Sequence, residues 1–232
     1  MLTTKDIRQI FVEKYKRGEF RTIGNAVQQS KTVEIQNANF LADSDWIIRK
    51  PNYEYFNREL EWYLSQSLNV NDIPGGAPAM WKACADKHGN INSNYGWVIF
   101  SEENGLQYNH CKWKLVDDNH TREAIMIYNR PSMQSDYRKA GMHDFMCTQN
   151  VQYFINERDG QEFVDCIVNI RSNDAVFGYD NDFLWFDWVL DKLSKDLTKE
   201  LYRNIGKGMI WWNAGSLHVY ERHFKFLEDA ED

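Results

Sequence analysis

Two apolar segments, residues 150–155 and 163–170, constrain the fold of this chain most, because each has the length of a buried strand. Cys147 comes just before the first segment, and Arg171 directly follows the second. If the two segments are neighbouring strands, an unpaired thiol and a guanidinium meet at one edge of a sheet. A nearby cation lowers the pKa of a cysteine, so we expect a thiolate–guanidinium site there. The alternative is that Cys147 is a small core residue, which is the commoner role of a lone cysteine.

The composition is that of a folded domain. With 232 residues the chain can bury a substantial core, and nine Trp with 15% aromatic residues exclude a disordered protein. We therefore predict a single domain over residues 1–232. Its 34 acidic and 27 basic residues give a net charge of −7, which argues against direct binding of nucleic acid. A few placed arginines can still bind one phosphate.

The four cysteines, at positions 84, 111, 147 and 166, form no CxxC motif, and we expect no signal peptide. A reduced, cytoplasmic protein with free thiols is the simplest interpretation. No stretch approaches a run of about eighteen apolar residues, so we expect no membrane segment. The six histidines show no HExxH motif or Cys/His cluster, so we expect no bound metal ion.

The spacing of apolar residues predicts helices and strands in mixed order. Helical spacing marks residues 3–17, 52–67, 104–116 and 182–197, with a short helix around Trp81. Besides the two segments named above, strands are predicted at residues 31–41, 124–128, 208–213 and 216–224. The segments predicted to be loops or irregular are residues 19–30, 92–97 and 130–143.

This order of elements lacks a regular βαβ rhythm, so we predict an α+β fold with a mixed β-sheet covered by helices on one face. The other face would be apolar and exposed in a monomer. We therefore expect a homodimer in which this face forms the interface. In the strand predicted at residues 216–224, Leu217 and Val219 point to one face, and His218 and Tyr220 to the other.

Six stretches of the chain carry a family resemblance. They are Arg58-Glu59-Leu60-Glu61-Trp62, Asn92-Ser93-Asn94-Tyr95-Gly96-Trp97, and residues 125–134, 144–153, 171–182 and 215–224. Together they resemble the thymidylate synthase superfamily and, more narrowly, the deoxycytidylate (dCMP) hydroxymethylases of large DNA phages. The similarity runs from about Lys31 to Phe226 and implies a thymidylate synthase-like fold. Several motifs in one order make the resemblance specific.

The resemblance implies covalent catalysis. Cys147 matches the family's nucleophile, which adds to C6 of the pyrimidine so that C5 can attack a one-carbon unit derived from 5,10-methylenetetrahydrofolate. Glu59 matches the family's general-base glutamate, which moves protons through ordered water. Without the resemblance, Glu59 would be expected to be solvated, as most carboxylates on helices are.

The resemblance also implies a nucleotide site. Arg171 and Ser172 match a pair that binds the phosphate, and the next residue, Asn173, is assigned to the same site. His218 and Tyr220 match contacts to the sugar 3′-hydroxyl, and their i, i+2 spacing puts both on one face of a strand.

Three further positions match residues that line the folate and pyrimidine pocket of the family. They are Trp81, Tyr95 and Asp174. For all three a structural role is the alternative, because buried aromatic side chains are usually core.

Asp182 is the position that bears on the base. Thymidylate synthases place asparagine here, whose amide donates to O4 of uracil and accepts from N3–H. Cytosine offers an amino group at C4 and an N3 that gains a proton when the ring is attacked. A carboxylate only accepts hydrogen bonds, so Asp182 favours cytosine over uracil.

One departure from the family concerns the phosphate site. The superfamily commonly supplies two adjacent arginines to the phosphate of the partner subunit, whereas this chain has Arg122 followed by Glu123. We expect Arg122 to serve the partner subunit and Glu123 either to turn away or to be balanced by another residue. Arg21 and Lys31 are candidates for the N-terminal phosphate contact.

The predicted reaction converts dCMP, 5,10-methylenetetrahydrofolate and water to 5-hydroxymethyl-dCMP and tetrahydrofolate, for modified phage DNA precursors. The alternative is a dCMP 5-methyltransferase that yields 5-methyl-dCMP and dihydrofolate, and both reactions use the same residues. A third hypothesis is a catalytically silent nucleotide-binding or scaffold protein. The intact Cys147, Glu59 and Arg171 argue against that third hypothesis.

Overall fold

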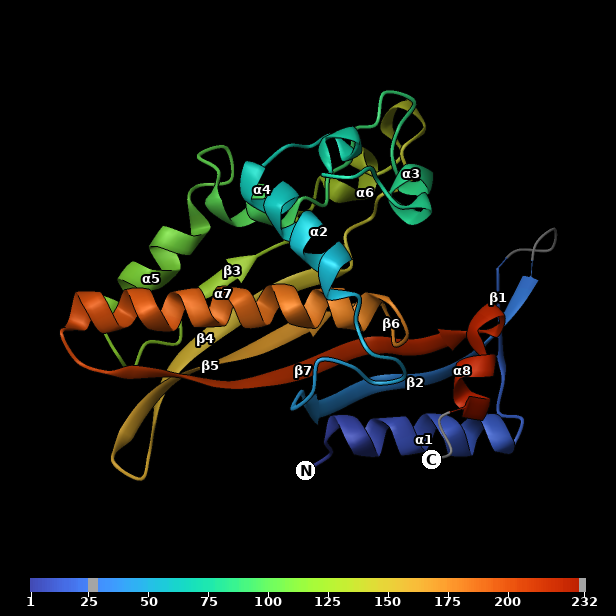
Figure 1. Cartoon of the computed structure of the whole chain (residues 1–232). Helices are drawn as coiled ribbons and strands as arrows, with labels where there is room; N and C mark the ends of the chain where they lie inside the picture. Colours follow the sequence, from blue (N-terminus) through green and yellow to red (C-terminus); the bar gives the residue numbers. More distant parts are fainter. Residues whose placement is uncertain (25–28, 230–232) are drawn as a thin grey trace.

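The computed structural model of the chain describes residues 1–24 and 29–229. In these residues the centre of the fold is a mixed sheet with strands in the order β1-β2-β7-β5-β4-β3, and β6 pairs with β7 (Figure 1). The strands are β1 (Arg21–Gly24), β2 (Gln29–Leu41), β3 (Ile125–Ile127), β4 (Thr148–Arg158), β5 (Gln161–Ile170), β6 (Asn173–Asp174) and β7 (Ile205–Tyr220). Pairing is antiparallel except that β5 and β6 run parallel to β7. The predicted α+β class with a mixed sheet is confirmed.

The helices are distributed unequally around this sheet. They are α1 (Thr4–Lys16), α2 (Tyr53–Ser65), α3 (Ala79–Cys84), α4 (Tyr95–Phe100), α5 (Gln107–Asp117), α6 (Met133–Asp136), α7 (Gly178–Leu201) and α8 (Lys225–Glu228), with short 3₁₀ turns η1 (Val70–Asp72), η2 (Lys139–Gly141) and η3 (Glu221–His223). Figure 1 shows α7 running along one side of the sheet, with α2 and α4 beyond it. The fully buried Phe186 of α7 packs on Trp212 of β7, with ring centroids 5.8 Å apart. This contact places the main core between α7 and the sheet.

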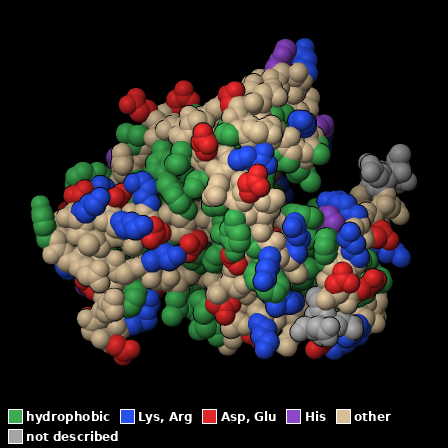
Figure 2. All heavy atoms as spheres, in the orientation of Figure 1, with side chains coloured by type: hydrophobic (Ala, Val, Ile, Leu, Met, Phe, Trp, Pro, Cys, Tyr) green, Lys and Arg blue, Asp and Glu red, His purple; other side chains and the backbone are tan. Residues whose placement is uncertain are grey.

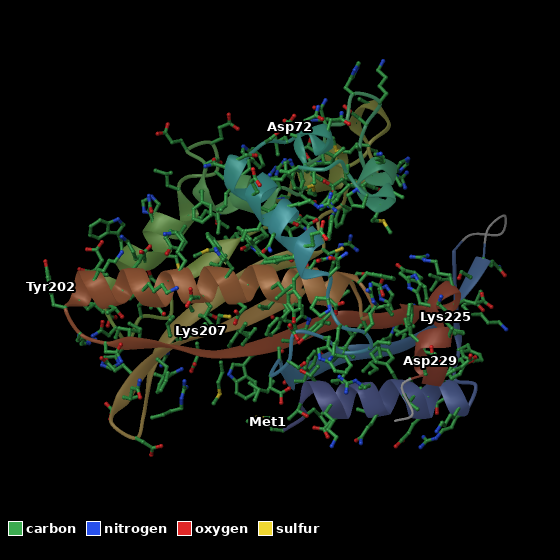
Figure 3. All side chains as sticks on the ribbon, viewed as in Figure 1. Met1, Asp72, Tyr202, Lys207, Lys225 and Asp229 are labelled. Atoms are coloured by element: carbon green, nitrogen blue, oxygen red, sulfur yellow. The ribbon has the colours of Figure 1, made fainter. Side chains whose placement is uncertain are left out.

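At the β2 end of the sheet, α1 and α8 lie on the opposite side from α7 (Figure 1). Thr3 caps α1 in a capping box with Asp6, and Ile7 and Phe11 are fully buried. The C-terminal turn packs against this helix, since Tyr15 donates to Glu228 Oε1 at 2.5 Å. In Figure 3, Lys225 and Asp229 lie beside α1, whereas Tyr202 projects from the far end of α7.

Three of the predicted segments have different boundaries in the structure. Part of the predicted loop 19–30 forms the edge strand β1, and residues 25–28 lie outside the described part. Residues 92–97 contain the start of α4, because the Asn94 side chain accepts from Trp97 N at 2.8 Å. Residues 208–213 and 216–224 are not separate strands, since one continuous strand, β7, ends at Tyr220 and is followed by η3.

Close approach of two helices explains the sequence of α4. A Cβ atom built on Gly96 would lie 1.8 Å from the carbonyl oxygen of Tyr63 in α2, so only glycine fits there. The two helices can therefore pack backbone to backbone. This contact brings Tyr95 over Tyr63, with stacked rings whose centroids are 5.4 Å apart.

The sheet face away from α7 is more polar than predicted. The cross-strand neighbours Asn39, Asn213, Asn169 and Asn150 form a row of side-chain hydrogen bonds across β2, β7, β5 and β4. Exposed apolar residues lie on the same face and on the edge strand β3: Ile125 (38% exposed), Ile127 (53%) and Met209 (37%). The uncovered face is therefore apolar in part and crossed by amides. On the side of the molecule in Figure 2, acidic and basic side chains are interspersed.

Candidate active site

Cys147 and Arg171 meet as the two strand ends predict. Thr148 of β4 pairs with Ile170 of β5, and the backbone N–H of Arg171 donates to the carbonyl of Cys147 at 2.9 Å. The guanidinium donates to the carbonyl oxygens of Phe145 (2.5 Å) and Met146 (3.1 Å) and stacks on the Phe145 ring. Arg171 therefore holds the segment that carries the thiol.

The predicted thiolate needs a correction. Burial raises the pKa of Cys147 to about 11, and Arg171 acts in the opposite direction, as expected of a cation. Asp182 and Asp144 raise the pKa further. Burial thus outweighs the guanidinium, whose hydrogen bonds go to backbone carbonyls. A pKa of about 11 corresponds to a protonated thiol near neutral pH, so a thiolate at this position would need a base to remove the proton.

Glu59 is buried, contrary to what its helical position alone suggests. It is 3% exposed on the inner face of α2. Tyr55 Oη donates to Glu59 Oε1 at 2.5 Å, and Trp81 Nε1 donates to the same oxygen at 2.6 Å. Burial raises the pKa of Glu59, while these two hydrogen bonds lower it. A buried carboxyl with a raised pKa that keeps two donors is suited to proton transfer.

Asp182 lies on α7, and each of its oxygens accepts a hydrogen bond. Tyr95 Oη donates to Oδ1 at 3.2 Å, and Asn173 Nδ2 donates to Oδ2 at 2.8 Å. Tyr95 Oη also bonds Thr148 Oγ1 at 2.8 Å, which links Asp182 to the residue after Cys147. Burial raises the pKa of Asp182 to about 7, and the charge of Glu59 contributes in the same direction. Asp182 therefore shares one electrostatic environment with both Glu59 and Cys147.

His218 and Tyr220 extend this site along β7. His218 is 6% exposed and pairs in parallel register with Asp174 of β6. The rings of His218 and Tyr220 have centroids 4.7 Å apart, so both side chains lie on one strand face, as their spacing predicts. Burial raises the pKa of Tyr220, with contributions from the charges of Asp174 and Cys147. Burial also raises the pKa of Asp174 to about 6.

Two further predicted phosphate residues, Ser172 and Arg122, lie in different surroundings from each other. Ser172 is half-buried between Arg171 and Asn173. Arg122 is exposed before β3, and its backbone carbonyl accepts from Gln152 Nε2 at 2.7 Å. Within this chain, the described contacts do not join Arg122 to the residues around Cys147.

Glu123 and the two N-terminal candidates for the phosphate contact, Arg21 and Lys31, all lie in defined surroundings. Glu123 turns to the surface and forms an ion pair with Lys114. Arg21 forms an ion pair with Glu34 at 2.5 Å, and Lys31 Nζ lies 5.7 Å from the centroid of the Phe20 ring. Among the two N-terminal candidates, Arg21 is therefore held by a carboxylate of the sheet.

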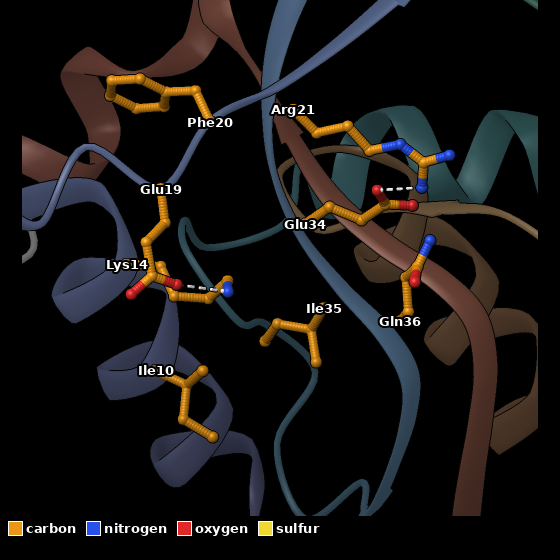
Figure 4. Close-up of a pocket in the computed structure, with 8 residues that line it drawn as sticks. All are labelled: Ile10, Lys14, Glu19, Phe20, Arg21, Glu34, Ile35 and Gln36. Atoms are coloured by element: carbon orange, nitrogen blue, oxygen red, sulfur yellow. Dashed lines mark hydrogen bonds and ion pairs between the residues drawn. The ribbon is translucent and has the colours of Figure 1, made fainter.

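A cavity of about 680 Å³ opens between α1 and β2 (Figure 4). Ile10 and Lys14 of α1 line it, together with Arg21, Glu34 and Gln36. Figure 4 shows Arg21 directed to Glu34, and Lys14 to Glu19. Cys147 and Asp182 do not line this cavity, so it is separate from the cluster described above.

In residues 1–24 and 29–229, no group of three or more His, Cys, Asp or Glu side chains is arranged to hold a metal ion. Over the same ranges, no helix has both the length and the apolar character needed to cross a membrane.

Comparison with known proteins places this arrangement in a family. The family model described as "Thymidylate synthase" matches residues 7–230. The chain belongs to the thymidylate synthase family. Its fold is similar to that of thermostable thymidylate synthase A from Bacillus subtilis, with a TM-score of 0.65 at 18% identity over 99% of this chain and 84% of that one. The predicted thymidylate synthase-like fold is thus confirmed.

Relatives within the thymidylate synthase family differ in how similar they are. Proteins named deoxycytidylate 5-hydroxymethyltransferase from Enterobacteria phages T4 and T2 are each 51% identical over 199 residues, which is 85% of this chain and 79% of theirs. A thymidylate synthase of Francisella philomiragia is 21% identical over 181 residues, which is 74% of this chain and 62% of that protein. The predicted resemblance to the phage enzymes is confirmed.

Sequence reasoning missed several polar residues of the site. Tyr55 could have been found, because it stands four residues before Glu59 on the same helical face. Thr148 had no separate signal beyond its place after Cys147. Glu34 and Ser216 come together only through the pairing of β2 with β7, which a sequence pattern does not give.

Proposed function

We propose that this chain is a deoxycytidylate 5-hydroxymethyltransferase, which converts dCMP, 5,10-methylenetetrahydrofolate and water to 5-hydroxymethyl-dCMP and tetrahydrofolate. The observation that carries the proposal is the 51% identity, over 85% of the chain, to phage proteins named for this activity. The carboxyl group of Asp182 in the buried cluster supports cytosine as the base.

Base recognition would be divided between Asp182 and Asn173. Each Asp182 oxygen accepts one hydrogen bond and keeps lone pairs for the amino group and the protonated N3 of cytosine. The Oδ1 atom of Asn173 is buried and has no partner among the described residues, so it can accept from a second donor. Uracil would donate from N3–H to one of these acceptors but present O4 to another, which would be left unpaired.

The covalent chemistry would be carried by Cys147, with Glu59 and Asp182 moving protons. Cys147 loses its proton and its sulfur bonds to C6, while N3 gains a proton from the side of Asp182. This makes C5 nucleophilic toward the one-carbon unit. A bond forms between C5 and the one-carbon unit. The C5 proton leaves to a base served by Glu59, tetrahydrofolate leaves the one-carbon unit, and water adds to the exocyclic methylene that results. The sulfur then leaves C6 and N3 gives up its proton, which restores the thiol and the aromatic ring.

The nucleotide would be oriented by residues at the ends of β5 and β7. Arg171 and Ser172 would bind the phosphate, and His218 with Tyr220 would contact the sugar 3′-hydroxyl. The guanidinium of Arg171 already lies beside the Cys147 segment, which supports a phosphate position close to the thiol.

The co-substrate would occupy the side of the site formed by Trp81, Tyr95 and Asp174. Trp81 is partly buried and keeps its indole on Glu59, and Asp174 has a pKa of about 6 as a result of burial. A carboxyl group of this kind can accept donors of the pterin ring, while the partly buried Trp81 can provide a stacking surface; the ring of Tyr95 is buried against Tyr63 and Phe186 and contributes its hydroxyl instead.

A second copy of the chain would complete the site. Ile125, Ile127 and Met209 remain exposed on or beside the uncovered face, which supports a homodimer. The row of four asparagines suits a self-complementary interface, because each amide both donates and accepts. In such a dimer the exposed Arg122 would reach the phosphate of the partner subunit.

The deciding experiment is mass spectrometry of the product formed from dCMP and 5,10-methylenetetrahydrofolate. We expect a hydroxymethyl group on C5 of the product. In a parallel absorbance assay we expect no rise at about 340 nm, where dihydrofolate would absorb. A methyl group in its place, with dihydrofolate formed, would assign the chain as a dCMP 5-methyltransferase. Tight dCMP binding without any product would favour a silent binding protein instead.

A further inference from the structure

Glu34, Ser216 and His218 form a chain of hydrogen bonds between β2 and β7. Glu34 lies opposite His218 in the antiparallel register of the two strands. Ser216 Oγ donates to Glu34 Oε1 at 2.6 Å, and Ser216 Oγ lies 3.2 Å from His218 Nδ1. The other Glu34 oxygen accepts from Arg21 at 2.5 Å, an ion pair visible in Figure 4. This series of hydrogen bonds thus runs from the exposed Arg21 to the buried imidazole of His218.

The direction of each bond follows from counting protons. Burial raises the pKa of Glu34, but hydrogen bonds from Ser216 and Arg21 and the charge of Arg21 hold it below its ordinary value. Glu34 is therefore a carboxylate and can only accept. Ser216 has a single hydroxyl proton, which points to Glu34. Toward His218 the same oxygen can then only accept, so Nδ1 must carry a proton.

The imidazole itself is neutral near pH 7. Burial lowers the pKa of His218, the Ser216 backbone and the charge of Glu34 act in the opposite direction, and Arg222 lowers it further. A neutral imidazole has one N–H and one bare nitrogen. With the proton on Nδ1, the bare nitrogen is Nε2, which has no hydrogen-bond partner among the residues that the structure describes.

We propose that Glu34, acting through Ser216, is a positioning residue that holds His218 as the Nδ1–H tautomer, so that Nε2 accepts a hydrogen bond from the 3′-hydroxyl of the nucleotide. This inference rests on the proposed function for the identity of the ligand. The hydrogen-bonded series Glu34–Ser216–His218, called the relay below, does not depend on that identity. It predicts that a nucleotide with a 3′-hydroxyl is preferred over one without it, because only the hydroxyl can donate to Nε2.

The tautomer is measured first, without any nucleotide. Nitrogen chemical shifts of the His218 ring, assigned by loss of the signal in His218→Asn, report which nitrogen is protonated. We expect Nδ1–H in the full-length protein and a shift toward Nε2–H in Ser216→Ala. Glu34→Ala should act in the same direction, because the Ser216 proton is then free to point at Nδ1. Ser216→Thr keeps the hydroxyl and should keep the tautomer.

Binding is measured second, as the ratio of dissociation constants for 2′,3′-dideoxycytidine monophosphate and dCMP. We expect this ratio to fall by about tenfold in Ser216→Ala, the effect of one hydrogen bond, and to return in Ser216→Thr. Gln36→Ala is the matched control, since Gln36 pairs with Ser216 across the strands and has an exposed side chain. It should leave both the tautomer and the ratio unchanged.

The two measurements separate the relay from the proposed function. An Nε2–H or doubly protonated ring in the unsubstituted protein at pH 7 would overturn the relay. So would a tautomer that shifts in Ser216→Ala while the ratio stays constant. Failure of the unsubstituted protein to bind dCMP would overturn the proposed function, and the ring shifts would still decide whether Glu34 sets the tautomer.

Discussion

Replacing Asp182 with asparagine should move nucleotide preference from dCMP toward dUMP. In the structure, Asp182 accepts from Tyr95 at Oδ1 and from Asn173 at Oδ2. An amide at this position can keep its oxygen toward Asn173 and turn its NH₂ group to the Tyr95 hydroxyl, which can accept. The side-chain volume and the local hydrogen bonds are thus kept. The groups that face the base change from two acceptors to one acceptor and one donor.

The size of the shift follows from the hydrogen bonds exchanged. Toward cytosine, one acceptor is replaced by a donor that faces the amino group, which costs about 1–3 kcal/mol in a buried site. Toward uracil, the new donor to O4 contributes about 1 kcal/mol. Together these amount to about 2–4 kcal/mol, or a change of about 30- to 1,000-fold in the ratio of kcat/KM for dCMP and dUMP.

The assay compares kcat/KM for the two nucleotides in the unsubstituted protein and in Asp182→Asn, with folding checked by circular dichroism. Asp180→Asn is the matched control, because Asp180 lies two residues earlier in α7 and is also buried with a raised pKa. Asp180 forms no described hydrogen bond with Tyr95, Asn173 or Asp182, so the ratio should not move. An unchanged ratio in a folded Asp182→Asn protein would remove Asp182 from base recognition.

Three other substitutions test separate parts of the site. Cys147→Ser should abolish turnover and the exchange of the C5 hydrogen of dCMP with solvent, with the dissociation constant of dCMP nearly unchanged; comparable turnover would refute the nucleophile assignment. Refolding Cys147→Ala together with Arg122→Ala should restore roughly a quarter of normal activity, since half the dimers are mixed and each has one intact site; no gain over the separate variants, despite subunit exchange, would place Arg122 in its own subunit. Asp180→Asn should flatten the pH dependence of unfolding. Burial raises the pKa of Asp180 to about 8, so its contribution to stability is fully present below its ordinary pKa and is lost as pH rises through 8, because over that range only the folded protein keeps the proton; an equal loss of unfolding free energy between pH 5 and pH 8 in the unsubstituted protein and in Asp180→Asn would contradict this.

The sequence was most informative where a residue's place depends on its own element. Cys147 and Arg171 could be placed together because each stands at the end of an apolar strand, and the two strands are neighbours. His218 and Tyr220 could be placed on one face because alternation along a strand is local. The same reasoning identified α1, α2 and most of α7, whose apolar spacing extends over several turns.

Features that depend on contacts between elements could not be predicted. Glu59 is buried because Trp81, which lies on a separate helix, covers it. The pKa of Cys147 is set by burial, which outweighs the single cation that the sequence reveals. The strand β7 was divided in two at Gly215, although that glycine is required because a Cβ atom would lie 2.9 Å from the carbonyl oxygen of Arg171. In each case the deciding partner is distant in the sequence.

The crowding of acids around the site connects its stability to its choice of base. The negative charge of Glu59 raises the pKa of Asp182, and the charge of Asp182 in turn raises the pKa of Cys147. The raised pKa values of these groups make the cluster less stable as pH rises, since each one marks a charge that burial disfavours. A ligand that brings hydrogen-bond donors reduces this electrostatic cost, whereas one that brings a further carbonyl oxygen increases it. Cytosine offers an amino group and a protonatable N3, so we expect dCMP to bind with uptake of a proton near pH 7. Discrimination against uracil therefore depends on the ionised form of Asp182, because a protonated carboxyl group could donate to O4.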